Sequence, residues 1–296
     1  MDKYVIYFAG GTMRGVFGAG VATAFERNNF RKKIVAIYGA SAGAMNGAYL
    51  LSGQIELGSS IYWENLPNGF VSYKNFIIGV WQRFQSRFIK NVVNENLRDP
   101  LDIDYLMNIV KKEKYLDVKK IISQEIPLNV KLFNLDTHEI EYLDARRPDI
   151  LEILETAVSV FPYVHHVSTI DGKKYIDAAI MEIIGIDHLK KKHPKEKIII
   201  VINRPPRKKL LFWAKNIIEG KFMEWMFHDS RFFKLHSCAE EILAKDLEII
   251  KLDPNIILIA PDEDVLVRSR TTDKNSILQM YNLGIKAGGD ALSKLL

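Results

Sequence analysis

The chain has 296 residues, 48% of them hydrophobic and 26% charged, so it can bury a sizeable core as one large domain or one domain with an appendage. Its 41 lysines and arginines against 36 aspartates and glutamates give a net charge of +5. This basic bias suits contact with an anionic surface such as phospholipid but is too diffuse to indicate nucleic-acid binding. The single cysteine, Cys238, excludes an internal disulfide framework and is typical of a reducing compartment.

The sequence contains no pattern typical of targeting or membrane-spanning segments. The apolar run at residues 4–8 is too short for a signal-peptide core and leads into glycine rather than a cleavage site. No apolar run approaches the length needed to cross a bilayer, and no Cys-x-x-Cys pair or histidine cluster indicates zinc. We therefore expect a cytoplasmic protein without a metal or cofactor.

Residues 3–8 predict a first strand, followed by a glycine-rich turn at residues 9–20 that opens a helix. Adjacent glycines after a strand leave backbone N–H groups free to bind an anion. A dinucleotide site would need the spacing Gly-x-Gly-x-x-Gly and an acidic residue at the end of the second strand. The glycines here are spaced differently, and the second strand ends in residues 39–41, Gly-Ala-Ser. An oxyanion hole fits better, and its candidate donors are the amides of Gly10, Gly11, Thr12 and Met13.

The next stretch predicts a strand, a sharp turn and a helix, with a serine at the turn. The β-branched run at residues 34–37 is typical of a buried strand. Ser41 follows it in a Gly-x-Ser-x-Gly frame, where Gly39 and Gly43 remove side chains that would collide in a tight turn. The turn would present the Ser41 hydroxyl beside the first amides of a helix, whose partial positive charge favours an alkoxide. The alternative is a turn in which Ser41 only caps the helix.

These two glycine motifs resemble those of the patatin-like phospholipases. Members of that family carry a Gly-Gly-Gly-x-[Arg/Lys]-Gly oxyanion loop, a Gly-x-Ser-x-Gly elbow and a later Asp-Gly-[Gly/Ala] motif with the second catalytic residue. The resemblance covers residues 3–205 and implies an α/β fold of three layers, α/β/α, around a central and mostly parallel sheet. The loop at residues 10–15 departs from the family pattern at Thr12, whose branched side chain disfavours a positive φ.

The middle of the chain, residues 52–126, has a helical pattern. It contains an aromatic stripe at residues 76–88, which is either core or a wall for an acyl chain. Two alternating runs, residues 127–133 and 139–143, predict strands, and a helix is expected at residues 149–158.

A hairpin at residues 167–176 with a turn at Asp171-Gly172 then leads to Asp177. The run Tyr175-Ile176-Asp177-Ala178 resembles the family's Asp-Gly-[Gly/Ala] motif, with Ala178 where glycine is usual and without the Asn and Pro that tend to follow. The resemblance implies that Asp177 is the proton acceptor. The alternative is a turn-capping aspartate after a strand.

The last third predicts a strand at residues 198–202, another at 255–259 and a final helix at 275–296. Between them, residues 205–236 interleave lysines with Trp213, Phe222, Trp225 and Phe227. This pattern indicates either two helices packed on the domain or an element lying at a membrane interface. We expect a catalytic domain over residues 1–205 and a C-terminal extension over residues 206–296 packed against it.

The resemblance implies a serine hydrolase that cleaves carboxylic esters of lipids. Ser41 would attack the ester carbonyl, Asp177 would accept its proton, and the amides of the glycine-rich loop would stabilise the developing charge. The substrate would be a lipid or another acyl ester, with peripheral contact to an anionic membrane and no nucleic acid. The residues that complete the motifs are Arg14, Gly15, Gly39, Gly43 and Ala178.

Three other functions stay open at this point. An α/β-hydrolase triad would use a late histidine, although the elbow in those enzymes follows several strands and Ser41 comes early. A non-catalytic lipid-binding or adaptor protein could retain the fold, and the glycine-rich turn could bind a nucleotide. The histidines available for a triad are His188, His193, His228 and His236.

Overall fold

The computed structural model describes residues 2–71, 99–160, 164, 167–179, 181–206, 217–221, 224–225, 229–262 and 267–295. Within these residues the strands form one sheet of eight, ordered β5-β6-β3-β2-β1-β7-β8, with β4 paired to β3. Their bounds are β1 (Tyr4–Phe8), β2 (Ile34–Gly39), β3 (Leu128–Asn134), β4 (Glu139–Asp144), β5 (Ser168–Ile170), β6 (Lys173–Asp177), β7 (Lys197–Val201) and β8 (Ile256–Ile259).

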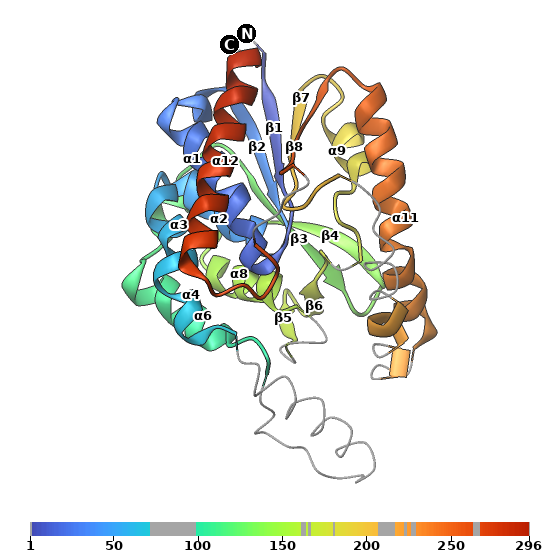
Figure 1. Ribbon diagram of the computed structural model, residues 1–296. Helices are drawn as coiled ribbons and strands as arrows, with labels where there is room; N and C mark the ends of the chain where they lie inside the picture. Colours follow the sequence, from blue (N-terminus) through green and yellow to red (C-terminus); the bar gives the residue numbers. More distant parts are fainter. Residues whose placement is uncertain are drawn as a thin grey trace.

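Helices cover both faces of this sheet (Figure 1). One face carries α1 (Val16–Arg27), α2 (Ala42–Ser52), α3 (Ile55–Glu64), α8 (Ile150–Val158) and α12 (Lys274–Leu295). The other face carries α9 (Ile186–Lys192) and α11 (Ser230–Leu252). Shorter helical segments are η1 (Thr12–Gly15), η2 (Phe30–Lys33), α4 (Leu66–Gly69), α6 (Ile103–Asn108), η3 (Ile109–Glu113) and α7 (Val118–Ile122).

The strand β1 shows why the central strands are uninterrupted apolar runs. Tyr4, Ile6 and Phe8 pack into the core on the side of α1 and α2, whereas Val5 and Tyr7 pack into the core on the side of α9 and α11. Strands buried on both faces need apolar residues at every position. The pairs β1-β2, β1-β7, β2-β3 and β7-β8 are parallel, so the predicted three-layer α/β/α fold with a mostly parallel sheet is confirmed.

The C-terminal part of the chain joins the same sheet and covers the same core. The strand β8 extends the sheet beside β7, and α12 packs along α1 (Figure 1). The two helices approach so closely that a Cβ on Gly20 would lie 2.1 Å from the Tyr281 carbonyl oxygen, and one on Gly284 would lie 2.1 Å from the Phe17 carbonyl oxygen. Glycine at both positions therefore permits this contact between backbones.

The sequence analysis did not single out α11, which begins after the N-cap Asp229 and extends over 23 residues. No helix of the described residues is both long and apolar enough to span a bilayer. The expected aromatic stripe at residues 76–88 lies outside the described residues, as do Trp213, Phe222 and Phe227.

Candidate active site

Ser41 occupies a sharp turn between β2 and α2. Its backbone has φ 53° and ψ −131°, a strained conformation for a residue with a side chain. Two backbone hydrogen bonds stabilise the turn: the Ala40 N–H donates to the Phe8 carbonyl (3.1 Å), and the Gly43 N–H donates to the Ala40 carbonyl (2.8 Å). A Cβ on Gly43 would lie 2.1 Å from the Phe8 carbonyl oxygen. Only glycine therefore lets α2 begin this close to the end of β1.

Asp177 ends β6 and is fully buried. Its Oδ1 accepts a hydrogen bond from the Ala179 N–H at 2.8 Å, and its Oδ2 is buried without a hydrogen-bond partner among the described residues. Burial raises the pKa of Asp177 to about 7, although the Ala179 N–H and the Ser41 side chain both lower it. The carboxylate can therefore gain and lose a proton near neutral pH.

Gly10 lies between the serine and the segment that follows the aspartate. A Cβ on Gly10 would lie 2.8 Å from the Ser41 Cβ and 2.9 Å from the Ala179 Cβ. The influence of the Ser41 side chain on the pKa of Asp177 agrees with this proximity. The fold thus brings the glycine-rich loop, the serine turn and the end of the hairpin together beyond the carboxyl ends of β1 and β2.

The glycine-rich loop presents unused backbone donors. Within the part of the chain that the structure describes, no group accepts a hydrogen bond from the Gly10 or Gly11 N–H. Thr12 and Met13 begin η1, where the first N–H groups have no acceptor inside the helix. Thr12 adopts φ 51° despite its branched side chain, at a cost of about 1–2 kcal/mol.

The other motif residues are Ala178, which departs from the family pattern, and three residues that match it, Arg14, Gly15 and Gly39. Ala178 is buried and is not among the described residues with positive φ, so its position does not require glycine. Arg14 and Gly15 complete η1, and a Cβ on Gly15 would lie 2.7 Å from the Ala42 Cβ. Gly15 therefore lets the loop lie directly against the start of α2. Gly39 has a similar role, since its Cβ would lie 2.7 Å from the backbone of Ala44.

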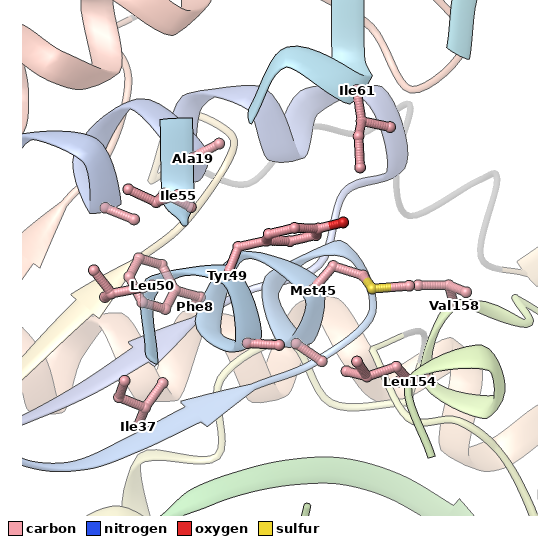
Figure 2. Packing of buried hydrophobic residues seen from close by; sticks show 14 of the residues in the cluster. Phe8, Ala19, Ile37, Met45, Tyr49, Leu50, Ile55, Ile61, Leu154 and Val158 are labelled. Atoms are coloured by element: carbon pink, nitrogen blue, oxygen red, sulfur yellow. The ribbon is translucent and has the colours of Figure 1, made fainter. Parts of the chain in front are cut away.

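An apolar pocket of about 50 Å³ opens beside Ser41. Met45 and Tyr49, one and two turns after the serine on α2, line it together with Ile61 of α3 and Val158 of α8 (Figure 2). Its full lining is Thr12, Ser41, Ala42, Met45, Asn46, Tyr49, Gly58, Ile61, Tyr62, Leu66, Phe70, Leu101, Leu106, Val110, Val158 and Val160. The sequence analysis missed the two α2 residues, although their spacing of four from the serine and from each other places them on one helix face.

A buried lysine lies near Asp177, on the neighbouring strand β3. Lys131 of β3 is fully buried, and its Nζ pairs with the Glu182 carboxylate at 2.6 Å and donates to the carbonyls of Glu182 (2.8 Å) and Ile184 (3.2 Å). Its charge lowers the pKa of Asp177. These bonds anchor the segment that follows Asp177. The sequence signal that could have identified it is a lysine that interrupts the apolar residues Val130, Leu132 and Phe133.

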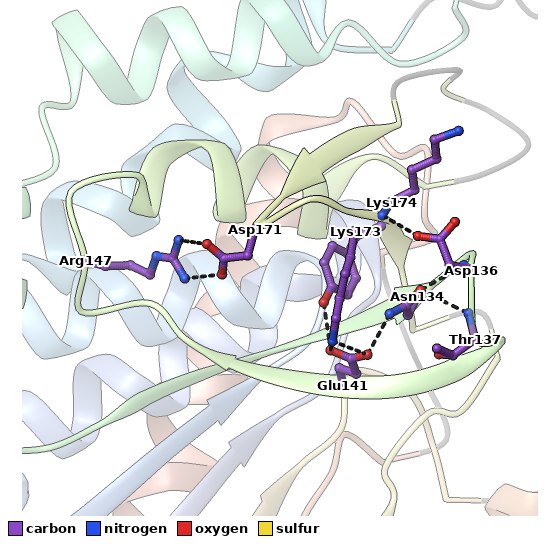
Figure 3. Close-up of polar contacts among 9 residues, drawn as sticks. Asn134, Asp136, Thr137, Glu141, Arg147, Asp171, Lys173 and Lys174 are labelled. Carbon is purple, nitrogen blue, oxygen red and sulfur yellow. Dashed lines mark hydrogen bonds and ion pairs between the residues drawn. The ribbon is translucent and has the colours of Figure 1, made fainter.

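Polar contacts also hold the hairpin that carries Asp177 (Figure 3). The Arg147 guanidinium donates to both carboxylate oxygens of Asp171 in the hairpin turn, at 2.7 and 2.8 Å. Glu141 of β4 accepts from the Tyr175 hydroxyl at 2.7 Å and from the Asn134 amide at 2.6 Å. The orientation of Asp177 therefore depends on contacts with neighbouring strands as well as on its own strand.

The described late histidines have other partners. His188 stacks on Tyr142 at 4.0 Å, and His193 Nε2 lies 2.9 Å from the Tyr38 hydroxyl. His236 Nε2 lies 3.2 Å from the Glu219 carboxylate, and His228 lies outside the described residues. Among the residues with a described position, no group of three histidine, cysteine or carboxylate side chains gathers as a metal site would require.

The fold and the arrangement of Ser41 and Asp177 place the chain in a class of α/β proteins with a serine at a strand-to-helix turn. The family model for patatin-like phospholipases matches residues 6–189, so the chain belongs to this family of lipid acyl hydrolases. Among solved structures, the chain is similar to the crystal structure of VipD from Legionella pneumophila, with a TM-score of 0.50, 16% identity and coverage of 99% of this chain and 67% of that one. At this identity the likeness concerns the fold alone. The search of curated proteins found no match.

Proposed function

We propose that the protein is a serine lipid acyl hydrolase that works through Ser41 and Asp177. The observation that carries the proposal is a serine with a strained backbone that lines an apolar pocket and whose side chain lowers the pKa of a buried carboxylate. A strained backbone conformation persists only where the surrounding structure holds it in place, and such positions cluster at functional sites. A buried carboxylate with a raised pKa beside a nucleophile is likewise typical of catalytic pairs.

The reaction proceeds by acyl transfer through two tetrahedral intermediates. The Ser41 oxygen attacks the ester carbonyl carbon while its proton passes to Asp177. The intermediate collapses, the bond to the alcohol breaks, and Asp177 returns the proton to the leaving oxygen. Asp177 then takes a proton from water, the hydroxide attacks the acyl-serine, and the proton returns to Ser41 as the acid leaves. The amides of residues 10–13 and the start of α2 stabilise the negative oxygen in both halves.

The raised pKa of Asp177 makes it a stronger base than an ordinary aspartate. A carboxylate with a pKa near 4 is a weak acceptor for a serine proton, whereas general bases work best with a pKa close to the working pH. The pKa of about 7 follows from burial of Asp177. The same burial leaves Oδ2 without a partner among the described residues, so this oxygen is available to accept the proton.

The pocket supports an acyl chain as the part of the substrate that is recognised. Its wall beyond Ser41 consists mainly of apolar side chains, including Met45 of α2 and Val158 of α8. Apolar pockets with few polar groups bind hydrocarbon and leave the polar groups to set orientation. We propose that the acyl chain lies there and that the alcohol part leaves on the other side of Ser41.

A fluorophosphonate probe and p-nitrophenyl esters of graded chain length test the proposal. The wild type should be labelled and should hydrolyse the esters, and Ser41→Ala should do neither. Ser52→Ala is the matched control, because Ser52 is a buried serine at the other end of the same helix. Equal labelling of wild type and Ser41→Ala would refute the role of Ser41. Activity lost on mutation of one histidine alone would favour a triad, and vesicle binding without turnover would favour an adaptor.

We also propose that the protein contacts anionic membranes peripherally. Lipid esters reside in aggregates, so an enzyme of this kind must reach an interface. The support is the net charge of +5 and the side chain of Ile218, which is 71% exposed in the helical segment at residues 217–221. Lys221 lies in the same segment, with a side chain that is 61% exposed and pairs with Glu224 at 2.9 Å. Basic groups beside an exposed apolar side chain are typical of elements that lie on anionic lipid.

A further inference from the structure

Asn203 connects two ends of the glycine-rich loop. It follows β7 and is only 2% exposed. Its Nδ2 donates to the carbonyl oxygens of Ala9 (2.7 Å) and Gly10 (3.1 Å), and its Oδ1 accepts from the Gly18 N–H (2.9 Å). The opposite orientation of the amide would set its oxygen against two carbonyls, so this set of partners defines the orientation. One side chain therefore joins the start of the loop to the first turn of α1.

These bonds also set the direction of the neighbouring N–H groups. In a planar trans peptide the C=O and the N–H point in opposite directions. The Ala9 carbonyl shares a peptide with the Gly10 N–H, and the Gly10 carbonyl shares one with the Gly11 N–H. Because Asn203 accepts neither N–H and binds both carbonyls, both N–H groups point away from it.

Gly10 contacts both Asn203 and Ser41, because its carbonyl accepts from the Asn203 amide and its Cα faces the Ser41 Cβ. A Cβ on Gly10 would lie 2.8 Å from the Ser41 Cβ, and a Cβ on Gly11 would lie 3.2 Å from the Asn203 Cβ. Gly10 thus lies between the serine and the asparagine, and Gly11 lies against the asparagine. Glycines have no side chain to limit rotation of their peptides, so an external contact has to keep both N–H groups in one orientation.

We infer that Asn203 is a positioning residue of the reaction: it orients the Gly10 and Gly11 N–H groups toward the oxygen that becomes negative when Ser41 attacks. This inference rests on the proposed function. It goes beyond it by assigning the orientation of the donors to a residue about 190 positions away in the sequence, in none of the three motifs. Loss of one oxyanion donor costs about 10²–10³ in kcat, and a donor that is only misoriented should cost less.

The test is Asn203→Asp in the full-length protein, because aspartate keeps the size and the acceptor for Gly18 but cannot donate to the two carbonyls. We expect kcat for a p-nitrophenyl ester to fall about 10–100-fold with KM nearly unchanged. The Ki for an alkyl trifluoromethyl ketone, which forms a tetrahedral oxyanion on the serine, should rise by the same factor. A merely structural role would lower the melting temperature without this match between kcat and Ki.

Asn28→Asp is the matched control, since the Asn28 amide donates to the Ala24 carbonyl (2.8 Å) at the other end of α1. It should leave kcat and Ki unchanged. A kcat for Asn203→Asp within about twofold of wild type would overturn the inference. If the wild type neither cleaves esters nor reacts with the ketone, the proposed function itself fails and the inference fails with it.

Gly18→Ala decides the question if Asn203→Asp does not fold. A Cβ on Gly18 would lie 3.0 Å from the Asn203 Oδ1, so the amide must shift, while alanine favours the helical backbone of α1. We expect a several-fold loss of kcat with an unchanged or higher melting temperature. An unchanged kcat in a folded Gly18→Ala protein would overturn the inference.

Discussion

Replacing Asp177 by asparagine should strongly reduce activity and stabilise the folded protein at the same time. The folded-state pKa is about 7 against an ordinary value of 3.8. Between these two pH values the folded protein holds a proton on Asp177 that the unfolded chain has lost, so the free energy of unfolding falls as the pH rises. The difference amounts to about 4 kcal/mol at 1.36 kcal/mol per pH unit. Above pH 7 both states are ionised and this contribution no longer changes.

Asparagine is neutral at every pH and keeps an acceptor for the Ala179 N–H. The Asp177→Asn protein should therefore match the wild type in stability near pH 4 and exceed it by up to about 4 kcal/mol at pH 8. Its kcat should fall about 10²–10⁴-fold, as expected for loss of a general base. In the wild type, kcat/KM should rise with pH through about 7, because only the ionised carboxylate accepts a proton.

Urea unfolding of both proteins at pH 5 and pH 8 measures the difference directly. Asp171→Asn is the control from the same hairpin, because the Arg147 side chain lowers the pKa of Asp171 instead of raising it. That variant should gain no stability at pH 8. If Asp177→Asn is no more stable than wild type at pH 8, or if its advantage is the same at pH 5, the reasoning from a protonated buried carboxylate is wrong.

Three further predictions concern the serine turn, the ion pair of Lys131 and Glu182, and the contact with membranes. Ser41→Gly should be more stable than Ser41→Ala by about 1–3 kcal/mol in urea unfolding, because glycine accepts the backbone of φ 53° and ψ −131° without strain; equal stability would mean that the turn is not strained. Lys131→Met combined with Glu182→Gln removes an ion pair whose buried lysine lowers the pKa of Asp177. The acid limb of the pH profile of kcat/KM should then move to higher pH, and an unmoved limb would contradict the electrostatic link. Binding of the wild type to vesicles should increase with anionic lipid and decrease with salt. Ile218→Ser should weaken it, and Leu252→Ser, which alters an even more exposed side chain at the end of α11, should not. Equal effects of the two changes would remove Ile218 from the interface.

The local elements of the fold were predictable because short-range patterns determine them. The apolar run before Ser41 became β2, and the alternating runs on either side of residues 136–138 became β3 and β4. The hairpin before Asp177 formed with its turn at Asp171-Gly172. In each case neighbouring residues fix the backbone, so periodicity and turn residues suffice. The long helix α11 was missed because its apolar positions are interrupted by many charged residues.

The sequence by itself determined the serine turn and the glycine-rich loop as parts of the candidate site, because the spacing of their glycines reflects steric limits on tight turns. Only the tertiary structure decided how they meet. The pKa of Asp177 depends on burial by segments far away in the chain, and Lys131 acquires its effect on Asp177 through β3. Asn203 reaches the glycine-rich loop because β7 lies beside β1. Burial and long-range hydrogen bonds depend on the packing of distant segments, which no local pattern of residues records.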